Sequence, residues 1–297
     1  MIPVESASGQ LFFSTVRIVA TMADGTPSVG TAFYFNVLLD PEGTRACNLL
    51  VTNKHVINGA VSGEFVLHEA SDASGDKPAG RTATVRVPKD FGAAWFRHPI
   101  SDVDLCMLPV HSVKEVLNNN GRHLFSRAFK DTDIPSTAAL AKLRGIEDVT
   151  MIGYPSGIWD SVHNMPIARR GVTAIHPSLR FMDKPIGIAD IGSFQGSSGS
   201  PVMILNEGSY HEGTALVLGH RIMLLGVMFG LTQYTTPGEI KITNIPTTPG
   251  DGVTTRIPMH LSLYVHASEL LVMKPMIEEL VREGWRSSIR LDMEFKE

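Results

Sequence analysis

The sequence of 297 residues has little that would tie it to a disulfide-rich, nucleic-acid-binding or membrane-spanning class. It contains two cysteines, Cys47 and Cys106, which are too few for a disulfide framework. The net charge of −4 gives no basic excess of the kind that nucleic-acid binding needs. No uninterrupted apolar run reaches the ~18 residues of a membrane-spanning helix. We therefore expect neither nucleic acid nor a membrane as a partner.

Export and metal signals are also missing. The first residues, Met1–Ser6, lack the basic segment and the apolar core of a secretory signal, so we expect a cytoplasmic protein. In that compartment two free thiols are favoured, although a Cys47–Cys106 bridge stays open as the alternative. The 11 histidines show no paired ligand spacing with cysteine or carboxylate. We expect no metal and no other cofactor.

What the sequence does contain is a series of short β-branched and aromatic runs, separated by Gly, Pro, Asn and Asp clusters. This texture predicts an all-β protein. The expected strands in the first half are Phe13–Thr21, Gly30–Leu38, Asn48–Thr52, Glu64–His68, Thr82–Val87 and Asp104–Leu108. Those in the second half are Asp148–Gly153, Pro166–Ile175, Ile186–Ile191, Pro201–Leu205, Met223–Gly230 and Leu261–Val265.

Helical patterns are confined to the middle and the end of the chain. Ser112–Leu117 and Thr137–Leu143 predict short connector helices, which we interpret as packing elements, with a partner surface as the alternative. A longer helix is expected over Glu269–Arg282, with Ser268 as its cap and Pro275 as a kink or restart.

The most informative motif is Gln195–Pro201, which reads Gln-Gly-Ser-Ser-Gly-Ser-Pro. Its glycines allow a tight turn in which the N–H groups of Gly196 and Ser198 converge on one point. Such a pair of donors stabilises an oxyanion beside a nucleophilic hydroxyl. Ser198 is favoured as that nucleophile over Ser197 and Ser200, because it alone is the serine of Gly-x-Ser-Gly.

A serine hydroxyl needs a base, and the base needs a carboxylate that fixes its tautomer. His55 follows the apolar run that ends at Thr52, and Asp104 opens the apolar run from Leu105. Asp102 lies on the same side of a strand as Asp104, and we interpret it as a solvated turn residue. The order His, Asp, Ser differs from that of α/β-hydrolases and of subtilisins.

With these motifs the chain resembles trypsin-like serine peptidases of the chymotrypsin fold, of the bacterial type without a signal peptide. Thr52–Val56 is similar to their Thr-Ala-Ala-His, and Asp104–Leu108 to their Asp-Ile-Ala-Leu-Leu. Met151–Pro155 resembles the start of their second barrel, and Gly226–Gly230 the strand beside their substrate cleft.

The resemblance implies two packed six-stranded antiparallel β-barrels with short connector helices and a C-terminal helix. The first barrel would span residues 10–130 with His55 and Asp104, followed by a helical connector over 131–147. The second barrel would span 148–266 with Ser198, and the C-terminal helix 267–290.

The resemblance also suggests where substrate binds. Gly192, six residues before Ser198, would lie at the base of the S1 pocket, which argues against cleavage after Arg or Lys. We expect an apolar or small P1 residue. Phe229 and Gly230 would wall the pocket and pair with the main chain of the substrate, and Gln195 would border the entrance. We interpret His260 as a loop residue. The alternative is that its side chain enters the pocket.

One departure from the family bears on control. Digestive relatives carry an aspartate directly before the nucleophile, which pairs with a newly freed N-terminus; here that residue is Ser197. That activating pairing cannot form here. We expect the chain to act as a serine endopeptidase on polypeptides, with its activity limited by narrow specificity or by a regulatory protein partner. The alternatives are a catalytically inactive protease-fold binding module and an esterase-type acyl hydrolase.

Overall fold

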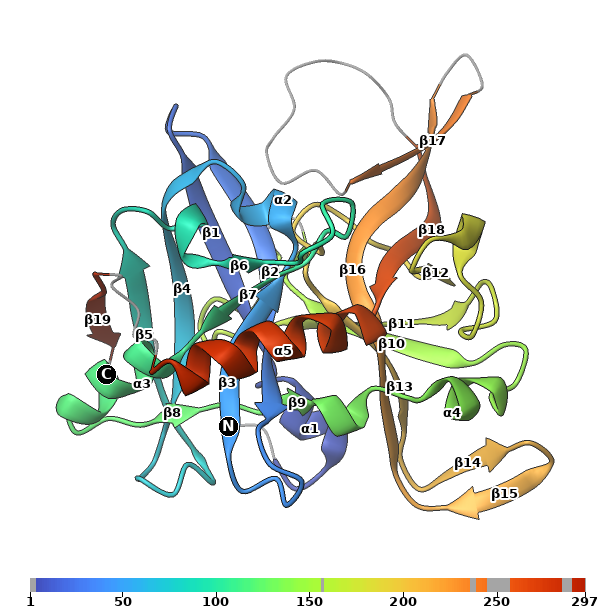
Figure 1. The fold of residues 1–297 in the computed structure, drawn as a ribbon, viewed down its shortest axis with the longest axis horizontal. Helices are drawn as coiled ribbons and strands as arrows, with labels where there is room; N and C mark the ends of the chain where they lie inside the picture. Colours follow the sequence, from blue (N-terminus) through green and yellow to red (C-terminus); the bar gives the residue numbers. More distant parts are fainter. Residues whose placement is uncertain (1–3, 156–157, 236–238, 245–256, 285–289, 297) are drawn as a thin grey trace.

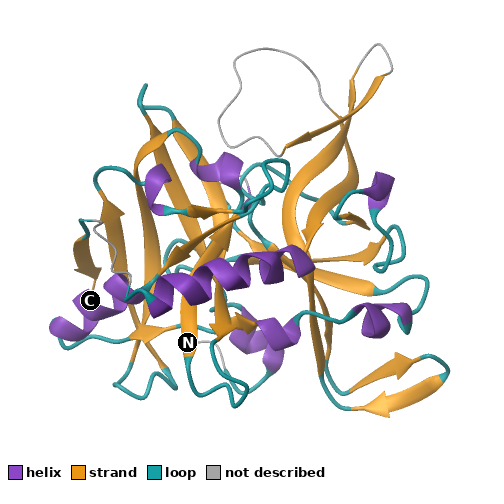
Figure 2. Cartoon of the chain, in the orientation of Figure 1, coloured by secondary structure: helices purple, strands orange, loops and turns teal. Residues whose placement is uncertain are grey.

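A computed structural model of the chain describes residues 4–155, 158–235, 239–244, 257–284 and 290–296. Two large, mainly antiparallel sheets lie side by side, and a long helix crosses them (Figures 1 and 2). The first sheet comes from the first half of the sequence together with one strand from the C-terminal end, and the second sheet from the second half. The all-β class expected from the sequence is confirmed, together with the short connector helices and the C-terminal helix.

The first sheet runs in the order β19-β5-β4-β1-β2-β3-β7-β6. Its strands are β1 (Thr15–Met22), β2 (Pro27–Leu38), β3 (Ala46–Thr52), β4 (Ala60–Ala70), β5 (Pro78–Val87), β6 (Phe96–Arg97), β7 (Cys106–Pro109) and β19 (Asp292–Lys296). Two short strands, β8 (Leu124–Phe125) and β9 (Phe129–Lys130), pair with β4 and β2. Six of these strands match the six expected.

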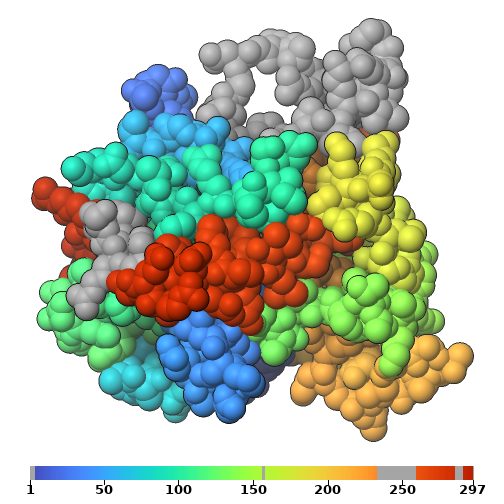
Figure 3. Space-filling model, viewed as in Figure 1, coloured from blue at the N-terminus to red at the C-terminus, as the bar shows by residue number. Residues whose placement is uncertain are grey.

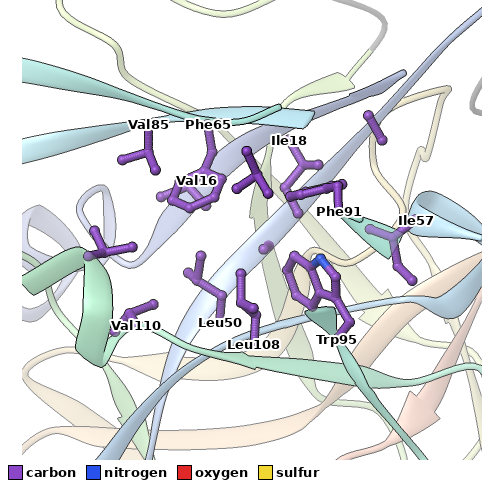
Figure 4. Packing of buried hydrophobic residues seen from close by; sticks show 14 of the residues in the cluster. Val16, Ile18, Leu50, Ile57, Phe65, Val85, Phe91, Trp95, Leu108 and Val110 are labelled. Carbon is purple, nitrogen blue, oxygen red and sulfur yellow. The ribbon is translucent and has the colours of Figure 1, made fainter. Parts of the chain in front are cut away.

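The first sheet curves around its own core. Val85 on β5 and Leu108 on β7 belong to distant strands of the sheet, yet both join one buried cluster with Val16, Leu50 and Phe65 (Figure 4). Inward-facing side chains alternate with outward ones along each strand, so a curled sheet can bury one face completely.

The second sheet closes on itself. Strand β13 (Pro201–Asn206) pairs with β10 (Asp148–Gly153) on one side and with β16 (Arg221–Thr235) on the other. The ring is completed by β11 (Ile167–Thr173), β12 (Ile186–Asp190) and β18 (Ile257–His266), which makes six strands. Strand β17 (Glu239–Asn244) pairs with β16 outside the ring, and the hairpin of β14 (Ser209–Glu212) and β15 (Ala215–Leu218) projects away (Figure 1).

Short helices fill the connections between strands. They are α1 (Ala7–Leu11), α2 (Lys54–Ile57), α3 (His111–Asn119) and α4 (Thr137–Ala141), with the 3-10 turns η1 (Gly92–Ala94), η2 (Asp131–Asp133) and η4 (Phe181–Asp183). The two connector helices expected from sequence correspond to α3 and α4. Cys47 and Cys106 are both free thiols.

The C-terminal helix α5 (Ser268–Arg282) differs from expectation at its start. Ala267 stands at the cap position without a side-chain hydrogen bond, so Ser268 opens the helix rather than capping it. The helix continues through Pro275 as one element. Figure 3 shows α5 lying across the face of the molecule, from the second sheet to the first.

The buried side of α5 joins a core shared by both sheets, not by the second alone. Leu270, Met273 and Ile277 pack in one cluster with Leu49 of the first sheet and Val227 of the second. The helix therefore helps to hold the two sheets together. The remaining members of the expected C-terminal segment, residues 285–289, lie outside the described residues.

Two adjacent leucines of α5 test this role. Leu270 is fully buried, whereas Leu271 is 39% exposed. We expect Leu270→Ala to lower the free energy of unfolding by about 2–5 kcal/mol, because it leaves a cavity in a packed core. Leu271→Ala should cost less than about 1 kcal/mol. Urea unfolding of both variants measures the difference, and equal losses would contradict the packing of α5 described above.

Candidate active site

Ser198, His55 and Asp104 form one hydrogen-bonded chain between the two sheets. The Oγ atom of Ser198 lies 2.8 Å from Nε2 of His55, and Nδ1 of His55 lies 2.5 Å from Oδ2 of Asp104. Ser198 is fully buried, while the side chains of His55 and Asp104 keep 16% and 17% exposure. Charge interactions are stronger in such a shielded place than in water.

Local structure fixes the histidine and the aspartate to one another. His55 lies on the short helix α2, directly after β3, and Asp104 lies in the loop before β7. The backbone N–H of His55 donates to Oδ1 of Asp104 at 3.1 Å, so both carboxylate oxygens contact the same residue. The amide of Asn53 donates to the backbone carbonyl of Asp104 at 2.7 Å. The imidazole and the carboxylate are thus held at both main chain and side chain.

The alternative carboxylate, Asp102, takes no part in the hydrogen bonds between Ser198, His55 and Asp104. It is exposed, and its carboxylate accepts a hydrogen bond from the hydroxyl of its neighbour Ser101 at 3.1 Å. Lys54 secures the loop that carries both aspartates by donating to the carbonyls of Ile100 and Ser101. Partial burial lowers the pKa of Lys54.

The nucleophile loop is held from the first sheet by Thr31 of β2. The backbone N–H of Thr31 donates to the carbonyl of Ser198 at 2.8 Å, and its hydroxyl donates to the carbonyl of Gly196 at 2.8 Å. Gly199 has φ of +87°, and a side chain there would overlap the carbonyl oxygen of Thr31. Only glycine fits this approach.

Some backbone N–H groups of the nucleophile loop donate hydrogen bonds within the protein, and others do not. The N–H groups of Ser197, Gly199 and Ser200 donate to carbonyls within the protein. Across the described part of the chain, no acceptor engages the N–H groups of Gly196 and Ser198. These two N–H groups are therefore free to donate to a bound group.

Ser197 contributes more than its backbone. Its side chain is buried, and its Oγ atom accepts a hydrogen bond from the N–H of Phe194 at 3.2 Å. The hydroxyl therefore closes the turn that leads into the nucleophile.

The expected substrate residues lie in two places. Gly192 and Gln195 are half-exposed on the nucleophile loop, and Gly192 lies beside Arg169 and His260. Phe229 faces the other side of the site, where it lines a cavity of about 720 Å³ together with Asp102 and Asp104.

Gly230 does not offer the open edge that was expected of it. It pairs with Asn244 of β17 on one side and with Leu263 of β18 on the other. The internal strand β17 therefore takes the place expected for an extended substrate. On β16, Val227 is the last residue that pairs with β13, and Gly230 is the first that pairs with β17. Phe229 lies between them and pairs with neither strand.

Three residues of the site have no local signal in the sequence. Thr31 is one of several threonines in strands, Asn53 precedes a helix, and Arg169 lies on β11. Their roles depend on contacts between segments far apart in the chain, which spacing and composition do not encode. Only a resemblance at those positions could have indicated them.

The described ranges contain neither a candidate metal-binding cluster nor a candidate membrane-spanning helix. No group of three or more His, Cys, Asp and Glu side chains there could hold a metal ion. None of the helices described is both long and apolar enough to cross a membrane.

Comparison with known proteins gives structural likeness only. No protein-family model and no curated protein matches the chain. The HtrA-type protease AlgW with tripeptide is similar over 92% of this chain and 62% of its own, less than two thirds, with 13% identity and a TM-score of 0.43. A scabies mite inactivated protease paralogue is 12% identical over 92% of this chain and 96% of its own, with a TM-score of 0.42.

Deg5 is 16% identical over 74% of this chain and 80% of its own, with a TM-score of 0.40. These similarities are too distant to bear on what the chain does. Function must be inferred from the geometry of its own residues.

The contact of Thr31 with the nucleophile loop can be tested by removing one hydroxyl. The Thr31 hydroxyl also accepts from the N–H of Tyr154, so Thr31→Val leaves two buried backbone groups unpaired. We expect a loss of about 1–3 kcal/mol in the free energy of unfolding. Labelling of Ser198 by a fluorophosphonate probe should slow at the same time, because Gly196 loses its anchor.

Thr15→Val is the matched control. Thr15 is equally buried on the neighbouring strand, and its hydroxyl has no hydrogen-bond partner among the residues that the structure describes. Urea unfolding and the labelling rate should both stay close to those of the native protein. If the two valine variants behave alike, Thr31 does not position the loop.

Proposed function

We propose that the chain is a serine endopeptidase of the chymotrypsin type, with Ser198 as nucleophile, His55 as general base and acid, and Asp104 as the carboxylate that orients His55. The observation that carries this proposal is the continuous hydrogen-bonded chain from Ser198 Oγ through His55 to Asp104, next to two open backbone donors.

The chemistry follows from the positions of the protons. Nε2 of His55 takes the proton of Ser198 as Oγ attacks the carbonyl carbon of the scissile bond. Nδ1–H donates to Asp104, which fixes the reactive tautomer and stabilises the imidazolium that forms. The N–H groups of Gly196 and Ser198 donate to the oxyanion of the tetrahedral intermediate.

Two further transfers complete the cycle. His55 returns its proton to the leaving amine, which departs as the C–N bond breaks and an ester forms on Ser198. Water then attacks the ester while His55 takes its proton, and the acid product leaves as Ser198 regains its hydrogen. No group outside the three side chains and the two N–H groups is needed.

A polypeptide substrate is favoured over a simple ester by the surroundings of Phe229. Its main chain lies at a gap in strand pairing beside Asp104, where a short extended segment can add to β16. Because β17 occupies the edge from Gly230 onward, this pairing is short unless β17 moves. That restriction supports narrow specificity or control by a partner.

The role of Ser198 is tested against its neighbour. Ser198→Ala should abolish both peptidase activity and fluorophosphonate labelling, because it removes the nucleophile and little else. Ser197→Ala should still label, although more slowly, since it loses the hydrogen bond from Phe194. A native protein that never labels would favour the inactive binding module, and cleavage of esters without peptides would favour an esterase. Labelling of the Ser198 variant would show that the nucleophile lies elsewhere.

The two aspartates provide a second test. Asp104→Asn should lower kcat/KM by about 10⁴-fold, because the amide favours the wrong imidazole tautomer. Asp102→Asn changes an exposed side chain and should cost little. Steady-state kinetics with one peptide substrate compares them, and similar losses in both variants would remove Asp104 from its proposed role.

A further inference from the structure

Two neighbouring arginines of β11 have opposite surroundings. Arg170 is exposed, and its guanidinium lies 2.7 Å from Oδ2 of Asp148. Arg169 is half-buried and turns to the other side of the strand, as alternation along a strand requires. Among the described residues, Arg169 has neither a carboxylate partner nor a hydrogen-bond acceptor.

The guanidinium of Arg169 lies at Gly192. A Cβ atom at residue 192 would lie 2.5 Å from one terminal nitrogen of Arg169 and 3.1 Å from Nδ1 of His260. The Arg169 carbon Cζ lies 4.7 Å from the centre of the Phe194 ring. The absence of a side chain at Gly192 is therefore what leaves room for the cation.

A half-buried cation without a counterion is incompletely solvated. Burial lowers the pKa of Arg169, although a guanidinium stays charged in proteins. The Phe194 ring offsets part of the lost hydration but accepts none of the N–H groups. A carboxylate would supply the missing acceptors, and arginine binds carboxylates with two parallel hydrogen bonds.

The two residues that contact this cation belong to the loop that carries the nucleophile. Gly192 and Phe194 precede Ser198 on the same loop, and Ser197 ties the loop at the N–H of Phe194. The resemblance places Gly192 at the base of the S1 pocket, where the side chain before the scissile bond would end.

We propose that Arg169 makes this site select an acidic residue, glutamate or aspartate, at P1 of the substrate. The proposal rests on the proposed peptidase function and replaces the earlier expectation of a small or apolar P1 residue. An apolar side chain would leave the guanidinium unpaired, and a basic one would be repelled. His260, the residue beside Gly192, lies within reach of the same carboxylate.

The test compares side chains of equal shape and different charge. Internally quenched peptide libraries with randomised flanks and a fixed P1 residue provide the pairs Glu against Gln and Asp against Asn. The native protein should cleave the better acidic library with a kcat/KM at least about tenfold above that of its amide partner, as expected for a charge-assisted pair. Equal rates within both pairs would overturn the proposal.

Variants at the two arginines assign the preference to one side chain. Arg169→Gln should reduce the acid-to-amide ratio to near unity, and Arg169→Lys should restore part of it. Arg170→Gln, which removes the outward arginine, should leave the ratio unchanged. Fluorophosphonate labelling of each variant reports whether Ser198 is still formed. A ratio that survives Arg169→Gln in a labelled protein would contradict the assignment.

The failure of this inference differs from the failure of the proposed function. Labelling and cleavage without an acid preference would overturn the inference alone. A native protein that neither labels nor cleaves would overturn the peptidase proposal. In that case fluorescence anisotropy with Ser198→Ala still decides on Arg169: a labelled peptide ending in Glu should bind at least about tenfold tighter than its Gln counterpart. Equal binding would count against it.

Discussion

The active geometry depends on one contact, the pairing of Thr31 on β2 with the nucleophile loop of the second sheet. His55 and Asp104 lie on connections between strands of the first sheet, and Ser198 lies on a loop of the second, so no local structure fixes the distance from His55 to Ser198. Thr31 joins the two through its N–H and its hydroxyl, both at 2.8 Å. Thr52 in turn donates to the carbonyl of Thr31 at 2.7 Å, just before the helix that carries His55. Base and nucleophile are thereby connected through one short path of hydrogen bonds.

Around this polar joint the two sheets share an apolar core. Phe33 and Leu49 of the first sheet pack in one cluster with Met203 and Val227 of the second, and Leu270 of α5 covers them. Close packing resists sliding because any shift opens voids or creates overlaps. The hydrogen bonds of Thr31 set the position of one sheet relative to the other, and the shared apolar core keeps that position rigid. Both are needed to hold Ser198 at hydrogen-bond distance from His55.

The sequence indicated what is local and missed what is not. Twelve expected strands have counterparts, because period-two alternation reports on a few neighbouring residues. Ser198, His55 and Asp104 stood out because each belongs to a short motif. The pairing of Gly230 with β17, the position of Arg169 at Gly192 and the start of α5 at Ser268 depend on contacts between distant segments. Such contacts are decided by tertiary packing, which a single sequence does not display.

The pairing of β19 with β5 has a consequence for the order of events during synthesis. Arg86 on β5 binds Glu294 on β19, and the two residues are separated by 208 positions. Translation runs from the N-terminus, so β5 leaves the ribosome long before its neighbour exists. Until then the edge of β5 is an unpaired row of backbone donors and acceptors, which invites association with other chains. Association through this edge is thus most favoured while only the first half of the molecule has been made. Chaperones or slow translation would affect the yield of folded protein mainly at that time.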